Sequence, residues 1–252
     1  MSVSSEFATL EQAATRSECV FDARSISVRY GGVLAVADLT ISVDRGQIVG
    51  LIGPNGAGKT SFIDAVSGFT RAAEGSVRVG DTKSDSLPAY RRARLGLVRT
   101  FQQLELFTDL TVGENLAVAA RYSGRGSSEY MMLAIDLFGL GDQLERQVHD
   151  LPQGQRRIVS LARAVAAGPL VMLLDEPAAG LDSDESIRLG TQLRKLADFG
   201  IGILLIDHDM GLVLGTCDWV QVMEYGRTIA AGIPKDIQND PAVLKAYLGD
   251  DQ

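Results

Sequence analysis

The chain has 252 residues, 46% of them apolar, which is enough to bury a sizeable core without disulfides or a structural metal. Its 24 basic and 32 acidic side chains give a net charge of −8, which argues against a protein whose main work is binding nucleic acid. Apolar runs such as 201–206 are far shorter than the roughly 20 residues that span a bilayer, so we expect no membrane-crossing segment. Cys19 and Cys217 match no zinc or redox spacing and are expected to be ordinary thiols in a reducing compartment.

The first 19 residues show neither a targeting signal nor a clear secondary-structure pattern. They carry Glu6 and Glu11 and lack a basic stretch followed by an apolar one, so they predict no secretory signal. We expect residues 1–19 to be a short flexible arm and residues 20–249 to form a single domain.

A β-layer followed by a nucleotide-binding turn is predicted at the start of this domain. Segments 20–28 and 39–43 are rich in β-branched residues, alternate partly and are separated by Gly31-Gly32, which indicates antiparallel strands. The apolar run 47–52 then ends in GPNGAGKT, and helical spacing follows over 61–66 until Gly68. The expected order is strand, glycine loop, helix.

The pattern turns helical in the middle of the chain. Thr111 and Glu114 form a candidate capping box, and a second helical stripe covers 130–138. These features predict a helical subdomain inserted over about 103–157.

Buried strands are expected to return at 170–174 and 201–206, joined by a helical run over 184–199 of the length that a parallel crossover needs. A hairpin over 219–223 and 227–230 and a final helix over 241–248 complete the chain. The predicted fold class is therefore α/β, with a parallel sheet as its core.

The run Gly53–Thr60 fits the phosphate-binding pattern G-x-x-x-x-G-K-[ST] between a predicted strand and a predicted helix. Glycines let successive backbone N–H groups point at a polyphosphate, Lys59 reaches the β- and γ-phosphates, and Thr60 can ligate Mg²⁺. The expected nucleotide-binding residues of this segment are Asn55, Gly56, Ala57, Gly58, Lys59, Thr60 and Ser61.

Three polar residues at the ends of predicted strands are candidates for the chemistry. Asp175 and Glu176 end a buried strand, where open α/β sheets bind ligands; we expect Asp175 at the magnesium and Glu176 at the attacking water. His208 follows the next strand and could hold the γ-phosphate. An acidic pair after a strand is also typical of a solvated turn, and a lone histidine is more often structural.

The order of these motifs resembles the ATP-binding cassette (ABC) ATPases over almost the whole chain, from about Val20 to Gly249. The resemblance implies a P-loop NTPase core that uses ATP and Mg²⁺. It also implies that Tyr30 stacks on adenine, although such an aromatic is often core or surface filler, and that Gln102 of RTFQ senses magnesium and the transmembrane partner. The dimer-contacting loop would be Ala179, Gly180, Leu181 and Asp182.

Within this superfamily the chain is most similar to the branched-chain amino-acid importer type. The markers are Tyr30-Gly31-Gly32, RTFQ at 99–102, DEPAAG at 175–180, DHDM at 207–210 and AYLG at 246–249. The resemblance implies transmembrane permease subunits, a second ATPase subunit and a substrate-binding protein as partners. It also implies a cytoplasmic chain held at the inner face of the membrane.

One motif departs from the family. The signature, usually L-S-G-G-Q or L-S-Y-G-Q, is here Leu151, Pro152, Gln153, Gly154 and Gln155. In the family the serine hydroxyl and nearby amides contact the γ-phosphate of the partner's ATP, and proline has neither a hydroxyl nor an N–H. Losing a hydrogen bond to a charged group costs about 1.5–3 kcal/mol, although proline still permits the helix. We expect an asymmetric heterodimer whose partner supplies a serine signature; a homodimer stays open.

Other functions remain open from the sequence. A lipid-exporting ABC ATPase has a similar length and a C-terminal YLG, a non-transport clamp would dimerise on ATP, and a degenerate module would bind nucleotide without hydrolysis. Amides, urea, aromatic acids and sterol-derived acids are alternatives to branched-chain amino acids as the cargo.

Overall fold

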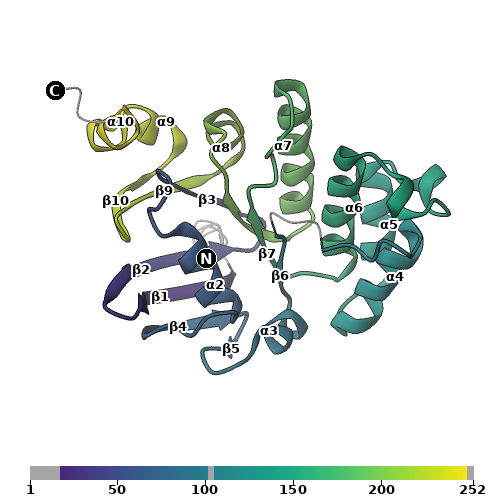
Figure 1. The fold of residues 1–252 in the computed structure, drawn as a ribbon, viewed down its shortest axis with the longest axis horizontal. Helices are drawn as coiled ribbons and strands as arrows, with labels where there is room; N and C mark the ends of the chain where they lie inside the picture. The colour runs from purple at the N-terminus through teal and green to yellow at the C-terminus, as the bar shows by residue number, and fades with distance from the viewer. Residues whose placement is uncertain (1–17, 102–104, 249–252) are drawn as a thin grey trace, which may run out of the picture.

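The computed structural model describes residues 18–101 and 105–248. Most of the predicted N-terminal arm therefore lies outside the described residues, as do Gln102 and Gly249. The described chain forms two sheets, helices that flank them and a separate group of helices at one end (Figure 1). Over these residues, none of the helices has both the length and the apolar character needed to cross a bilayer.

The first sheet is antiparallel, with the order β2-β1-β4-β5. Its first two strands form the predicted hairpin around Gly31, whose φ is 58°. They are longer than predicted, because bulges at Ser25 (φ 51°) and Asp38 (φ 56°) allow pairing to continue past the breaks in alternation. The strands are β1 (Cys19–Tyr30), β2 (Val33–Asp44), β4 (Glu74–Val79) and β5 (Thr82–Lys83).

The second sheet has the order β10-β9-β3-β8-β7-β6 and is parallel except for the edge strand β10. Every residue of β3, β7 and β8 is buried, as expected for continuous apolar strands covered on both faces. The strands are β3 (Ile48–Ile52), β6 (Leu97–Arg99), β7 (Val171–Asp175), β8 (Gly202–Ile206), β9 (Trp219–Glu224) and β10 (Arg227–Gly232).

Two apolar clusters cover the two faces of the parallel sheet. One fills the space between the sheets and includes Leu39, Leu51, Phe62 and Leu173. The other packs Ile203 and its neighbours against helices on the opposite face and continues into the helical group. Because side chains of a strand alternate between faces, these buried runs contribute to both clusters.

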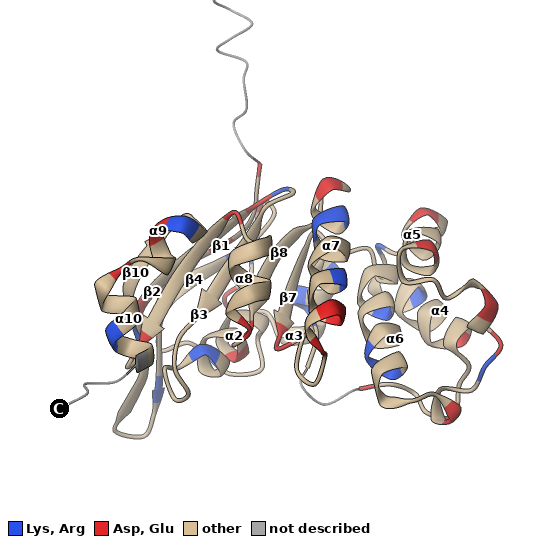
Figure 2. Ribbon diagram, turned by 90° about the horizontal axis from the view of Figure 1, so that it is seen from above, with Lys and Arg blue, Asp and Glu red and all other residues tan. Residues whose placement is uncertain are grey.

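The inserted helical subdomain is present. Its three helices lie beside one another at the end of the molecule farthest from the C-terminal helices (Figures 1 and 2). The predicted capping box begins the first of them: the Glu114 amide donates to Thr111 Oγ1 at 3.2 Å, and the Thr111 amide to Glu114 Oε2 at 2.8 Å. The helical elements are α4 (Val112–Ser123), α5 (Ser128–Phe138), the 3₁₀ turns η1 (Gly141–Gln143) and η2 (Val148–Asp150), and α6 (Gln153–Ala166).

The remaining helices flank the sheets. The helix after the glycine loop, the long crossover helix and the final helix begin and end close to the predicted positions. Several short elements were not predicted, among them β4, β5, β6, α3, α8 and α9. The helices are α2 (Lys59–Ser67), α3 (Ala89–Leu95), α7 (Ser183–Asp198), α8 (Met210–Thr216), α9 (Pro234–Gln238) and α10 (Pro241–Leu248).

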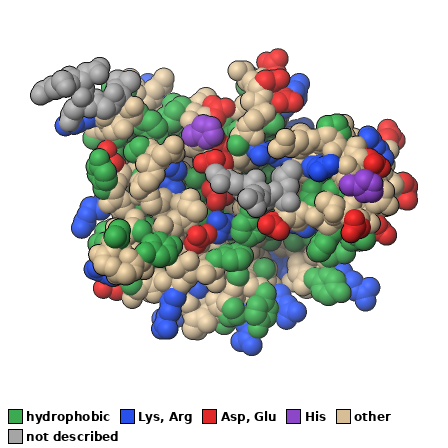
Figure 3. All heavy atoms as spheres, viewed as in Figure 1, with side chains coloured by type: hydrophobic (Ala, Val, Ile, Leu, Met, Phe, Trp, Pro, Cys, Tyr) green, Lys and Arg blue, Asp and Glu red, His purple; other side chains and the backbone are tan. Residues whose placement is uncertain are grey.

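Charged side chains are spread over the surface. On the face shown in Figure 3, the described lysines and arginines are scattered between acidic and apolar side chains rather than gathered into one patch. Such a face offers no continuous track for a phosphate backbone.

Candidate functional site

Three glycines with positive φ shape the loop between β3 and α2. Gly53 (φ 151°) and Gly58 (φ 105°) have no room for a side chain, since an added Cβ would lie 2.0 Å from the Met223 oxygen and 2.3 Å from the Ala35 oxygen. Gly56 (φ 81°) faces open space, with no described atom within 4 Å of the Cβ position. The loop is therefore closed against protein at its ends and open in the middle, where a phosphate group would approach.

The turn between β9 and β10 supports this loop from a distant part of the sequence. The Gly226 amide donates to the Ala57 oxygen at 2.8 Å, and the Ala37 amide of β2 donates to the Gly226 oxygen at 2.8 Å. Tyr225 in the same turn is exposed and has a φ of 44°. Both sheets thus contribute to the shape of the loop.

Lys59 lies across the loop that it follows. Its Nζ donates to the Gly53 oxygen at 2.6 Å and to the Pro54 oxygen at 3.0 Å. Burial lowers the pKa of Lys59, while the carboxylates of Glu176 and Asp175 act to raise it. The ammonium group is therefore close to both acidic residues and to the opening of the loop.

A cavity of about 440 Å³ lies in front of the glycine loop. It brings together all seven predicted loop residues with both predicted acidic residues, although β3 and β7 are distant in sequence. The carboxyl ends of parallel strands meet at one edge of a sheet, which explains this arrangement. The lining residues are Val33, Leu34, Ala35, Asn55, Gly56, Ala57, Gly58, Lys59, Thr60, Ser61, Asp175, Glu176, Ile206, Tyr225 and Gly226.

Asp175 is the more buried of the two acidic residues and forms an ion pair. Arg99 Nη2 donates to Asp175 Oδ2 at 3.2 Å, and both side chains are 7% exposed. Burial raises the pKa of Asp175, whereas the Arg99 guanidinium acts to lower it. The guanidinium thus favours the ionised form, which a metal ligand requires.

Glu176 has the unusual φ of 50° for a residue with a side chain. Its amide donates to the Ile206 oxygen of β8 at 2.7 Å. On the other side, Arg157 of α6 donates from Nη1 to the oxygens of Glu176 (3.4 Å), Pro177 (3.2 Å) and Ala179. Hydrogen bonds from β8 and α6 therefore fix the backbone around Glu176.

The residues present fit a magnesium ion held together with a phosphate. Among the described residues, no group of three or more His, Cys, Asp or Glu side chains could hold a metal by itself. Mg²⁺ in nucleotide sites needs only one or two protein oxygens, because phosphates and waters complete its octahedron. Thr60 and Asp175 both line the cavity and supply hard oxygen ligands of this kind.

Among the described residues, Tyr30 and His208 were predicted to contact this chain's own nucleotide but do not line the cavity. Tyr30, at the end of β1, is 47% exposed, and Tyr225 lies at the cavity instead. His208 is exposed, with its amide donating to Asp207 Oδ1 at 2.8 Å. The buried Asp207 carboxylate also accepts from the Ala178 amide at 2.9 Å and so links the end of β8 to the loop after β7. The stacking role of Tyr30 and the phosphate role of His208 stay predictions.

The signature residues lie at the start of α6, in the helical subdomain. Pro152 is the N-cap, with no side-chain hydrogen bond, and the helix forms after it as predicted. Pro152, Gln153 and Gly154 are exposed and do not line the cavity. In the predicted dimer loop, Gly180 has a φ of 80°, and Asp182 caps α7 by accepting from the Glu185 amide at 2.8 Å.

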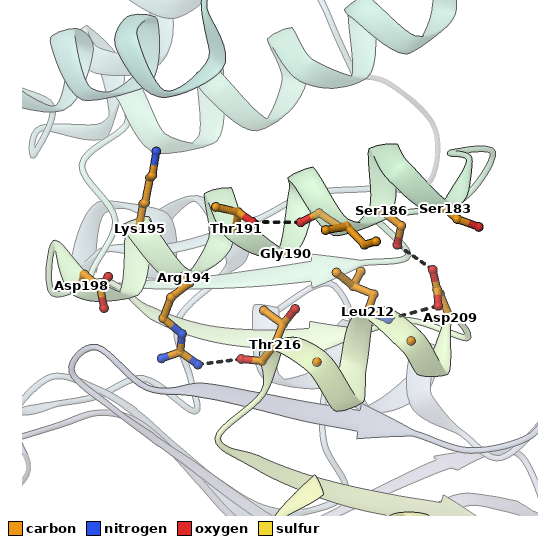
Figure 4. A pocket seen from close by; sticks show the side chains of 13 residues that line it. Ser183, Ser186, Gly190, Thr191, Arg194, Lys195, Asp198, Asp209, Leu212 and Thr216 are labelled. Carbon is orange, nitrogen blue, oxygen red and sulfur yellow. Dashed lines mark hydrogen bonds between the residues drawn. The ribbon is translucent and has the colours of Figure 1, made fainter.

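A larger groove of about 760 Å³ lies between α7 and α8 (Figure 4). Some of its polar side chains are bonded to protein: Ser186 Oγ donates to Asp209 Oδ2 at 2.6 Å, and Arg194 Nη2 to the Thr216 oxygen at 2.6 Å. Its lining contains no glycine loop, and the Asp209 carboxylate caps the start of α8 by accepting from the Leu212 amide at 3.1 Å, so the smaller cavity is the better nucleotide site.

Sequence reasoning missed several side chains of this region. Arg99, Arg157 and Asp207 act on the acidic loop through tertiary contacts, and Tyr225 lines the cavity. Arg99 and Asp207 belong to the RTFQ and DHDM motifs, so the sequence indicated these segments but not the roles of the two side chains. Arg157 and Tyr225 gave no pattern that pointed to the site.

The cavity with its glycine loop, lysine and two strand-end carboxylates defines a P-loop nucleotide hydrolase of the cassette type, and comparisons with known proteins agree. A family model described as ABC transporter matches residues 36–179, and one described as branched-chain amino acid ATP-binding cassette transporter matches residues 227–252. The chain therefore belongs to the ABC transporter ATPases.

Individual relatives cover almost the whole chain. The high-affinity branched-chain amino acid transport ATP-binding protein LivG of Escherichia coli (strain K12) is 37% identical over 253 residues, covering 93% of this chain and 99% of that protein. The lipopolysaccharide export system ATP-binding protein LptB of the same organism is 34% identical over 236 residues, covering 91% and 97%. The ADP conformation of MJ1267, an ATP-binding cassette of an ABC transporter, has a TM-score of 0.82 at 27% identity, covering 92% and 99%.

These matches establish the activity class. The chain is a nucleotide-binding subunit that hydrolyses ATP to ADP and phosphate, and the reaction is coupled to transport. The predicted α/β fold class, with its P-loop core, antiparallel subdomain and helical insertion, is confirmed.

Proposed function

We propose that this ATPase drives the import of branched-chain amino acids, or of a related small organic solute, with ATP bound between two ATPase subunits. The match over residues 227–252 carries the substrate class. It covers β10, α9 and α10, which hold none of the predicted phosphate-binding residues, so it reflects more than general ATPase chemistry. The similarity to LivG over 93% of this chain supports the same class.

ATP would bind in the cavity in front of the glycine loop. Amides of the loop and the start of α2 would donate to the β- and γ-phosphates, and Lys59 would exchange its bonds to the Gly53 and Pro54 oxygens for phosphate oxygens. Thr60 and Asp175 would hold Mg²⁺, which would supply positive charge against the negative charge that develops in phosphoryl transfer. Adenine would lie toward β1, β2 and the turn around Tyr225, where Tyr30 is the predicted stacking partner.

Glu176 would orient the attacking water. The water oxygen forms a bond to the γ-phosphorus while the bond from that phosphorus to the bridging oxygen breaks, so ADP leaves and the water proton passes to the Glu176 carboxylate. His208 would donate to the γ-phosphate once the subunits close. Gln102, outside the described residues, keeps its predicted role of linking magnesium to the permease.

The proposed assembly contains permease subunits, a second ATPase and a substrate-binding protein. The exposed signature at the start of α6 supports ATP sharing, because these residues are available to another molecule and not to this chain's own cavity. Pro152 favours a heterodimer whose partner has an intact signature. The subunit would be held at the inner membrane face by its permeases, with no nucleic acid as partner.

Uptake into proteoliposomes tests the proposal. The chain with its permeases is reconstituted with ATP inside and the binding protein and radiolabelled leucine outside, and Glu176→Gln serves as the inactive control. We expect ATP-dependent leucine accumulation that is lost in Glu176→Gln. If an amide, urea or an aromatic acid is taken up and leucine is not, the protein is still an importer of small solutes but its substrate is not a branched-chain amino acid.

Lipid export is the second candidate, because LptB is 34% identical over 91% of this chain. ATP-dependent release of lipopolysaccharide from the same vesicles, with no solute uptake, would favour it. ATP turnover with neither transport activity would favour a non-transport clamp. Nucleotide binding without turnover would favour a hydrolysis-deficient module.

A further inference from the structure

Arg99 joins three parts of the molecule through one buried side chain. It ends β6, and its side chain is 7% exposed. On α2, its Nη1 donates to Asp64 Oδ1 at 2.6 Å and to Ser67 Oγ at 3.1 Å. Its Nη2 donates to Asp175 Oδ2 at 3.2 Å. The guanidinium therefore connects the helix that follows the glycine loop with the carboxylate of the metal site.

Two aromatic rings restrict this guanidinium. Its central carbon lies 5.6 Å from the ring centroid of Phe69 and 4.8 Å from that of Phe101. The two rings meet edge to face, with their centroids 5.3 Å apart. Contact with two rings that are packed against each other limits the movement of the guanidinium, whose two ends bind different carboxylates. Phe101 also belongs to the RTFQ run, which reaches this site through Arg99.

Arg99, Asp64 and Asp175 together carry one positive and two negative charges. One guanidinium serves two carboxylates, of which Asp64 is 29% exposed and Asp175 only 7%. Water can solvate Asp64 in part, whereas Asp175 depends more on its cationic partner. A divalent cation at Asp175 would repel the guanidinium, and Asp64 provides the acid with which Arg99 can then remain paired.

We propose that Arg99 is a positioning residue for the magnesium site. Asp64 attracts the same guanidinium and thereby weakens the ion pair between Arg99 and Asp175, which makes the Asp175 carboxylate more available to the metal. The inference rests on the proposed magnesium site at Thr60 and Asp175. Arg99 orients the Asp175 carboxylate before the metal binds, and Asp64 competes with Asp175 for the guanidinium. Metal affinity is therefore tuned by a residue that does not itself ligate the metal.

Metal-dependent nucleotide binding tests this role without relying on turnover. Fluorescence of mant-ATP is measured against Mg²⁺ concentration in the wild type and in Asp64→Asn, and again in EDTA. In Asp64→Asn the guanidinium loses its second carboxylate, so we expect the Mg²⁺ concentration at half-effect to rise about tenfold, with unchanged nucleotide affinity in EDTA. Asp81→Asn is the matched control, since its carboxylate is fully exposed and its change should move neither quantity.

The Asp64 charge could also act on the metal directly rather than through Arg99. Repeating the Asp64→Asn substitution in an Arg99→Gln background separates the two effects. If Asp64 acts through Arg99, its substitution shifts the Mg²⁺ dependence less than about twofold when Arg99→Gln is also present. A shift of equal size in both backgrounds overturns the inference, as does no shift in Asp64→Asn. Circular dichroism checks folding; should Arg99→Gln unfold, Arg99→Lys replaces it, because an ammonium lacks the fork that joins both acids.

Asp175→Asn distinguishes failure of this inference from failure of the proposed site. If Asp175→Asn leaves the Mg²⁺ dependence unchanged, the proposed metal site is wrong and the role of Arg99 falls with it. If Asp175→Asn weakens metal binding but Asp64→Asn does not, the metal site stands and only the role of Arg99 and Asp64 is rejected.

Discussion

The glycine loop shows how single residues carry the site. Gly56 and Gly58 both have positive φ, but their surroundings differ: the first faces open space and the second faces the Ala35 oxygen. Backbone strain and steric clash are therefore separable at two positions of one loop.

Substituting alanine at these two glycines separates the two costs. Gly56→Ala should destabilise the nucleotide-free chain by about 1 kcal/mol from backbone strain alone. Gly58→Ala should cost about 2 kcal/mol more, because its Cβ would lie 2.3 Å from a backbone oxygen. Urea unfolding without nucleotide measures both, and equal midpoints would show that the Ala35 oxygen moves away at little cost.

The half-buried Lys59 predicts a pH dependence of nucleotide binding. Burial lowers its pKa from the ordinary 10.5, so the ammonium that is proposed to bind phosphate is lost as pH rises through a value below that of an exposed lysine. Affinity for mant-ATP, measured between about pH 7 and pH 10, should fall toward the alkaline end. Lys59→Arg keeps its charge over this range and should give a flat curve; parallel curves for the two proteins would show that another group titrates.

At the scale of elements, the buried strands and the long helices could be predicted, and the short elements could not. Continuous apolar runs placed β3, β7 and β8 within one or two residues, because both faces of a parallel sheet are covered. Elements of two to seven residues, such as β5 and α3, are too short to show a period and depend on tertiary pairing.

The same division holds for the site. The glycine loop was predictable because its chemistry is local to eight consecutive residues. The ion pair between Arg99 and Asp175 was not, since it joins positions on neighbouring strands that no spacing rule connects. The turn around Tyr225 reaches the cavity only through the folding of the late hairpin.

Arg157 links two elements, the signature helix α6 and the loop that carries Glu176. Arg157→Met should lower turnover by roughly tenfold to a hundredfold with little change in KM for ATP. If Glu176 orients the attacking water as proposed, a small displacement of its carboxylate slows the reaction more than it weakens ATP binding. ATPase kinetics at saturating permease partner test this. Arg188→Met, at an exposed position of α7, should change neither constant; a fall in ATP affinity alone in Arg157→Met would assign it to binding.

At the scale of the whole molecule, we expect Pro152 to decide whether the ATPase pairs with a second copy of itself. In a Glu176→Gln background that blocks hydrolysis, Mg-ATP should leave the chain monomeric, and adding Pro152→Ser should produce dimers, because the restored hydrogen bond is worth about 1.5–3 kcal/mol. Light scattering measures the mass. Pro152→Ala, which restores only the N–H, should dimerise less, whereas a full dimer of Glu176→Gln alone would favour a homodimeric motor.

The contacts between the β9–β10 turn and the glycine loop also determine when, during translation, the chain can first bind nucleotide. The Ala57 oxygen receives its bond from Gly226, and Met223 borders both Gly53 and Gly58, so segments from opposite ends of the chain complete one turn. A nascent chain made from its N-terminus contains the loop early but lacks these contacts until most of its length has been translated. Competence to capture nucleotide is therefore expected to appear late, after the surrounding sheets have formed, so that unfinished chains do not engage ATP.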